Sequence, residues 1–115
     1  MVTKVGSKVH PRYKGFSEWH VEGISEITKP IEYVDSVQGS VEYAPKILNL
    51  RNSRGVKALW FAYWISTDKT MNKLKWGQGP PMLEESVLLE LLKNAISQGF
   101  LSSKALKELR AIAGD

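Results

Sequence analysis

Residues 56–67 read VKALWFAYWIST and contain the longest uninterrupted apolar run of the chain, from residue 58 to residue 65. In an extended strand, successive side chains point to opposite faces, so Trp60 and Trp64 share one face while Phe61 and Tyr63 share the other. Both faces are apolar, which is typical of a central strand that is covered on both sides. The stretch therefore predicts a β-sheet with residues 56–67 near its middle.

Shorter strands are expected on either side of this one. The polar residues 66–72 form a turn, and KLKW (73–76) is a returning strand that makes a hairpin with residues 56–67. Upstream, residues 18–22 alternate between apolar and charged, and Pro30 interrupts the pattern because proline cannot donate to a strand ladder. Residues 31–43 predict a hairpin whose turn is either Asp35-Ser36 or Gln38-Gly39, and residues 52–55 predict another turn. We therefore expect an antiparallel sheet of about four or five strands between residues 16 and 76.

The C-terminal third of the chain predicts two helices. After GQGPP (77–81), apolar residues recur at helical spacing and predict a helix over about 82–98. Gly99 suits the left-handed position that ends a helix, and Ser102 or Ser103 suits the N-cap of a second helix over about 103–113. Because strands come first and helices last, we expect an α+β fold in which an αα-hairpin packs on one face of the sheet.

The length of 115 residues fits a single domain. Residues 1–14 are polar, and their charged residues are all basic, which predicts a flexible arm and leaves residues 15–115 as one α+β domain. The basic residues of this arm are Lys4, Lys8, Arg12 and Lys14. The arm has no apolar signal core, the chain has no cysteine, and no apolar run approaches the length of a membrane span. We therefore expect a cytoplasmic protein that has no membrane partner.

Charge is distributed unevenly along the chain. Residues 15–45 carry six acidic side chains against Lys29, a net charge of −5, and residues 46–75 carry seven basic side chains against Asp68, a net charge of +6. Such asymmetry can mark a surface that binds a polyanion. Alternatively, the two segments are neighbouring strands whose charges pair across the sheet. The sequence leaves both explanations open.

A basic segment that also contains aromatic residues favours nucleic-acid binding. Bases of single-stranded nucleic acid stack on aromatic rings while lysines contact phosphates. The expected contact residues are Arg51, Arg54, Lys57, Tyr63, Lys69, Lys73, Lys75 and Trp76 within residues 46–76, together with the four basic residues of the arm. Trp60 and Trp64 are assigned to the core instead. The leading interpretation is a non-catalytic binding module, although no RRM, KH or helix-turn-helix signature accompanies it.

Two other interpretations use different features. A structural or adaptor subunit would use the aromatic strand and the C-terminal helices to join other protein subunits or a second copy of itself. A small enzyme would use Glu18, His20 and Glu22, which project to one side of a predicted strand. No catalytic motif supports the enzyme, because the S-x-x-K pattern at residues 66–69 lacks its companion elements. We predict no cofactor and no metal site.

Overall fold

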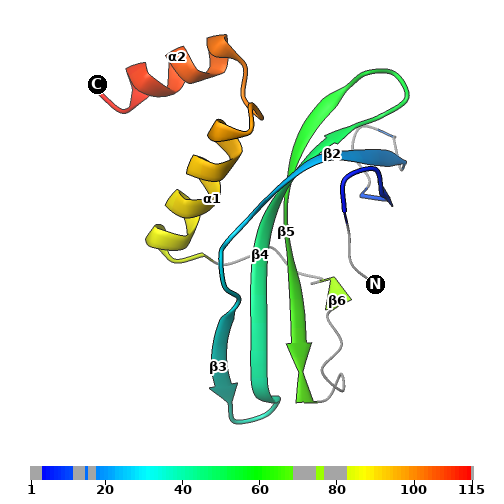
Figure 1. The fold of residues 1–115 in the computed structure, drawn as a ribbon, viewed down its shortest axis with the longest axis vertical. Coiled ribbons are helices and arrows are strands. Elements are labelled where there is room, and N and C mark those ends of the chain that lie inside the picture. The colour runs from blue at the N-terminus through cyan, green and yellow to red at the C-terminus, as the bar shows by residue number, and fades with distance from the viewer. Residues whose placement is uncertain (1–3, 12–14, 16–17, 69–74, 77–82, 115) are drawn as a thin grey trace.

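The computed structural model describes residues 4–11, 15, 18–68, 75–76 and 83–114. Within these residues the strands are β1 (Lys8–Val9), β2 (Trp19–Glu26), β3 (Ile31–Asp35), β4 (Gly39–Arg51), β5 (Lys57–Thr67) and β6 (Lys75–Trp76), and the helices are α1 (Glu85–Ser97) and α2 (Ser103–Ile112). All strand pairs are antiparallel. The predicted α+β fold, with an antiparallel sheet followed by two helices, is thus confirmed (Figure 1).

The long strand β4 organises the sheet. The strand order is β1-β2-β4-β5-β6, and β3 also pairs with β4. β2 pairs with residues 46–51 of β4, and β3 pairs with residues 39–43, so these two strands lie along successive halves of the same side of β4. The connection between them contains Pro30, which cannot donate to a ladder and therefore separates the two halves.

Side-chain oxygens of Asp35 and Asn52 close the two long hairpins. An Asp35 carboxylate oxygen accepts the backbone N–H groups of residues 37 and 38 at 2.7 and 3.0 Å, and Gly39 follows with a φ of 80°. The Asn52 side-chain oxygen accepts the N–H groups of residues 54 and 56 at 2.9 and 3.0 Å, and Gly55 also has a φ of 80°. Only glycine adopts this left-handed conformation without a steric cost, so both turns follow from local sequence.

The register of β4 and β5 defines two faces of the sheet. Odd-numbered residues of β4 pair with odd-numbered residues of β5, as Ile47 does with Phe61, and these form what we call the helix face. Even-numbered residues, including Trp60 and Trp64, form the tryptophan face. α1 packs on the helix face, where its Leu91 and Ala95 are buried against Ile47.

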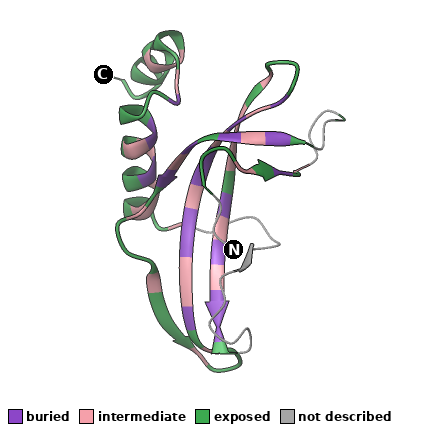
Figure 2. Ribbon diagram, turned by 45° about the vertical axis from the view of Figure 1, so that its right-hand side comes forward, coloured by how far each residue is buried: buried purple, intermediate pink, exposed green. Residues whose placement is uncertain are grey.

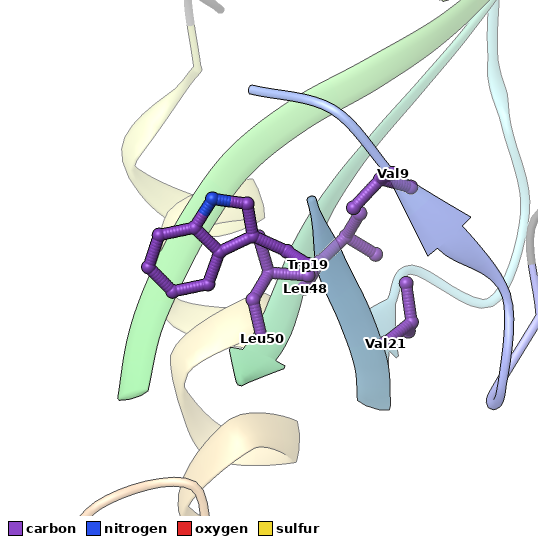
Figure 3. Close-up of a cluster of buried hydrophobic side chains, with 5 residues drawn as sticks. All are labelled: Val9, Trp19, Val21, Leu48 and Leu50. Carbon is purple, nitrogen blue, oxygen red and sulfur yellow. The ribbon is translucent and has the colours of Figure 1, made fainter. Parts of the chain in front are cut away.

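The tryptophan face carries the second core cluster. Its buried side chains are Val9, Trp19, Val21, Leu48 and Leu50 (Figure 3). Trp60 is half-buried at the border of this cluster, and Trp64, farther along β5, is 4% exposed. Most of the aromatic side chains of residues 56–67 are thus covered by the fold, and Phe61, which is 38% exposed, is the most accessible of them.

Part of the predicted arm lies in the sheet. β1 pairs with β2 through Lys8 and Val9, and the Gly6 N–H donates to the Val21 carbonyl oxygen at 2.7 Å. Val9 is buried, and this single apolar side chain attaches the segment to the core. An isolated valine produces no periodicity, which is why the sequence did not predict a strand here. Lys4 and Lys8 are exposed, while Arg12 and Lys14 lie outside the described residues.

The two helices differ in their packing. α1 ends at Ser97, Gly99 follows with a φ of 77°, and the buried side chain of Phe100 anchors this end to the core. The Ser102 hydroxyl oxygen then accepts the Ala105 N–H at 3.1 Å and starts α2. α2 has no buried residue and projects away from the sheet (Figures 1 and 2). Packing on the sheet is therefore the role of α1.

Candidate nucleic-acid interface

Acidic and basic side chains meet across β2 and β4. Lys46 Nζ lies 2.6 Å from a carboxylate oxygen of Glu26, and Arg51 Nε lies 3.1 Å from one of Glu22. Each pair joins the acidic segment 15–45 to the basic segment 46–75, as the cross-strand explanation of the charge pattern anticipates. The pairs cancel part of the positive charge of residues 46–75, and they give Arg51, one of the predicted contact residues, an intramolecular partner.

The predicted contact residues fall into separate regions. Lys57 Nζ donates to the Phe100 carbonyl oxygen and links the start of β5 to the end of α1. Arg54 is exposed in the turn between β4 and β5. Tyr63 lies six residues beyond Lys57 on the same face of β5, which corresponds to about 20 Å along the strand. Arg51, Arg54 and Lys57 are therefore at one end of the sheet, and Tyr63 is nearer the other.

A groove of about 740 Å³ surrounds Tyr63 on the helix face. Its lining residues are Ile31, Tyr33, Tyr43, Tyr63, Ile65, Leu83, Glu84 and Val87. The ring centroids of Tyr43 and Tyr63 are 5.1 Å apart with a tilt of 57°, and Tyr33 is 46% exposed. We call this feature the tyrosine groove. Three tyrosine rings on one accessible surface are a suitable platform for planar ligands.

The groove is open because α1 is shorter than the strands that it covers. Both α1 and β4 have 13 residues. A helix of this length spans about 20 Å, whereas a strand spans about 43 Å. Within the described residues, α1 covers the half of the helix face around Ile47, whereas the half around Tyr43 is reached by the start of α1 and the residues just before it, at Leu83, Glu84 and Val87. Its first helical residue is Glu85 rather than residue 82, the start that the sequence predicted.

Sequence reasoning identified Tyr63 and missed Tyr33 and Tyr43. Tyr43 pairs with Ile31 on β3 and with Ile65 on β5, so it lies between the two other strands of the groove. Tyr33 is two residues from Ile31 and therefore shares its face. The signal available in the sequence was that all three tyrosines have odd residue numbers. Odd numbers indicate a shared face only once the strand register is known, and the turn at residues 36–38 sets the register of β3 against β4.

Among the described residues, one charged side chain lines the groove. Glu84, at the N-terminal end of α1, is the charged residue in its lining. β6 pairs with β5 so that Lys75 is opposite Ile65, a groove residue. Lys69 and Lys73 belong to the connection between β5 and β6 and lie outside the described residues. Trp76 is paired with Trp64 through the backbone of β6.

The opposite face of β3 and β4 is acidic. Glu32 and Glu42 are directly opposite each other in the β3–β4 register and line a second pocket, which shares Tyr33 with the tyrosine groove. Like charges at such positions repel each other and would also repel a polyanion. At this end of the sheet, the face that carries Glu32 and Glu42 is thus unfavourable for a polyanion.

Two of the three residues considered for an enzyme are engaged in ion pairs. Glu18 is exposed and lies 3.8 Å from Lys8, while Glu22 is engaged with Arg51. A register shift between Val21 and Gly23 also changes the alternation along β2. Among the described residues, no three histidine, aspartate or glutamate side chains are close enough together to hold a metal ion.

Comparisons with protein-family models, with curated proteins and with solved structures find no match to this chain. Among the helices that the structure describes, none is both long enough and apolar enough to cross a membrane. A function for the chain is therefore proposed from the tyrosine groove and from the charges around it.

Proposed function

We propose that this chain is a non-catalytic module that binds single-stranded nucleic acid in the tyrosine groove. The observation that carries the proposal is the gathering of Tyr33, Tyr43 and Tyr63 in one groove on the helix face. Stacking on an aromatic ring contributes about 1–3 kcal/mol per base and tolerates any sequence, because every base has a π face. Bases within a duplex are already stacked on one another, so a groove of this kind favours unpaired strands.

Phosphate contacts are assigned to the lysines that follow β5. Lys69, Lys73 and Lys75 lie within seven residues of sequence, and the backbone of Lys75 is paired with that of Ile65 at the groove. In contrast, Arg51 and Lys57 already bind groups of their own chain. We therefore assign the main electrostatic contribution to residues 69–75 and a smaller one to the hairpin end that carries Arg54.

Replacement of Tyr33 by alanine should weaken the binding of a fluorescently labelled single-stranded oligonucleotide by about 5- to 150-fold, the range expected for loss of one stacked base. Tyr33 is the test residue because it is 46% exposed on β3, so its removal leaves the core intact. Fluorescence anisotropy at low salt measures the change in dissociation constant.

Two further variants control this measurement. Val34→Ala changes the neighbouring side chain, which is 82% exposed and points to the opposite face of β3, and it should bind like the unmodified protein. Tyr33→Phe retains the ring and should also bind normally. If the unmodified protein binds no oligonucleotide at low salt, or if Tyr33→Ala binds as tightly as Val34→Ala, the groove is not a nucleic-acid site.

The double variant Lys73→Ala/Lys75→Ala should reduce the dependence of affinity on salt. Each phosphate neutralised on a single strand contributes about 0.7 to the slope of log affinity against log salt, so loss of two contacts should lower the slope by about 1.4. Titrations at several salt concentrations measure the slope. The matched control is Lys104→Ala/Lys107→Ala, which removes the same charge from exposed positions on α2. Equal slopes for the two double variants would contradict the assignment of phosphate contacts.

A further inference from the structure

Three polar side chains form a row across β3, β4 and β5 on the tryptophan face. Glu32 is directly opposite Glu42 in the β3–β4 register, and Glu42 is directly opposite Ser66 in the β4–β5 register. Directly opposite residues of neighbouring antiparallel strands have Cβ atoms about 5 Å apart on the same face of the sheet. All three residues line one pocket of about 570 Å³. The register of three strands thus brings two carboxylates and one hydroxyl to a single cavity.

The two carboxylates of this row lack a counter-ion within the described residues. On the other half of β4, Glu22 and Glu26 each bind a basic side chain of that strand. In the part of the chain that the structure describes, neither the Glu32 nor the Glu42 carboxylate has an ion pair or a hydrogen bond. Like charges at directly opposite positions destabilise a sheet. A cation bound between them would replace this repulsion by attraction.

The hydroxyl of Ser66 indicates which kind of cation fits. Ser66 is only 6% exposed, yet no hydrogen-bond partner for its hydroxyl is found among the described residues. Buried hydroxyls are normally hydrogen-bonded, so a hydroxyl that lines a cavity without a partner is available to a ligand. A primary ammonium group has three N–H donors. Glu32, Glu42 and Ser66 each supply an oxygen acceptor, so the row matches an ammonium group in the number of its hydrogen bonds.

We propose that this row binds the ammonium group of a primary alkylamine, which is protonated at neutral pH. The cavity is larger than a bare metal ion needs and is in the usual size range of small-molecule sites. Val34 also lines it and is 82% exposed, so it offers an apolar contact to the alkyl chain. The same ammonium group is carried by a free aliphatic amine and by a lysine side chain.

The amine site is separate from the proposed nucleic-acid site. Glu32, Glu42 and Ser66 lie on the tryptophan face, whereas the tyrosine rings lie on the helix face. The inference is therefore independent of nucleic-acid binding. Glu42→Gln should leave the affinity for a single-stranded oligonucleotide unchanged, so failure of one proposal can be told from failure of the other.

Titration of the full chain with 1-butylamine at low salt, followed by backbone amide NMR, tests the site. Saturable shifts are expected at residues 32, 42 and 66. Glu42→Gln and Ser66→Ala should each weaken binding by about tenfold or more, because each loses a hydrogen bond that charge strengthens. Both substitutions are close in size to the original side chain, so the amide spectrum should show that the sheet is retained. The matched control is Glu108→Gln, which removes the same charge from an exposed position on α2 and should bind normally.

Three further ligands test the chemistry of the site. Tetramethylammonium has the same charge but no N–H donor, and it should bind more weakly than 1-butylamine. Nα-acetyl-lysine amide carries the same ammonium group and four-carbon stem on a peptide backbone, and the tighter of the two amines identifies the source of the ligand. The proposal is overturned if neither amine gives saturable shifts at the row, if tetramethylammonium or Mg²⁺ binds as tightly as the amines, or if Glu108→Gln weakens binding as much as Glu42→Gln.

Discussion

Replacement of Trp19 by alanine should lower the free energy of unfolding by about 3–5 kcal/mol, the usual cost of removing a large buried ring. Trp19 is 1% exposed and lies in the cluster that joins β1, β2 and β4 on the tryptophan face (Figure 3). Small domains have a total stability of about 5–15 kcal/mol, so the variant should be close to unfolding at room temperature. Urea denaturation followed by circular dichroism measures the change.

Tyr33→Ala is the matched control for Trp19→Ala. It also truncates an aromatic side chain on a strand that borders β4, but Tyr33 is 46% exposed and should cost much less stability. If Trp19→Ala does not fold, Trp19→Phe provides a smaller truncation whose stability can still be measured. A loss for Trp19→Ala no larger than that for Tyr33→Ala would show that this cluster is not a structural core.

Replacement of Gly23 by alanine should destabilise the protein by about 1–3 kcal/mol, because overpacking forces neighbouring groups to move. A Cβ atom at this position would lie 2.6 Å from Cε1 and 2.9 Å from Cζ of Phe100. Phe100 is 2% exposed and anchors the end of α1 to the sheet, so its ring has little room to shift. Thermal or urea denaturation measures the loss.

A double-mutant cycle tests whether the Phe100 ring is the cause. Phe100→Leu shortens the side chain and costs stability by itself, but Gly23→Ala should be less harmful in that background. A coupling free energy of about 1 kcal/mol in this direction would confirm the contact between β2 and the end of α1. Strictly additive effects would mean that the cost of Gly23→Ala arises elsewhere.

The fold could be predicted from sequence to a large extent because its signals are local. The apolar run at residues 58–65, the proline at residue 30 and the leucine spacing of residues 83–96 each act within one element. The same holds for the caps, since Gly99 and Ser102 lie at the expected end of α1 and start of α2. The exception within the sheet is β1, whose place depends on Val9 alone.

The candidate site was less predictable because it depends on distances between elements. Tyr63 was identified from its neighbours in sequence, whereas Tyr33 and Tyr43 join it only through the register of three strands. Arg51 and Lys57 seemed suitable for phosphate contacts, but each has a partner from another element of the chain. The charge composition of a segment does not reveal these contacts, because Arg51 is 29 positions from Glu22 and Lys57 is 43 positions from Phe100.

By itself, then, the sequence indicated most of the strands, both helices and which sides of the helices are apolar, but it missed β1 and left the turn of the 31–43 hairpin undecided. These properties follow from backbone preferences and side-chain periodicity within each segment. Only the tertiary structure decided that α1 packs around Ile47, that three tyrosines meet in one groove farther along the same face and that no residue of α2 is buried. Those outcomes depend on strand register and on the unequal rise of helix and strand, which become physical constraints only when the elements pack together.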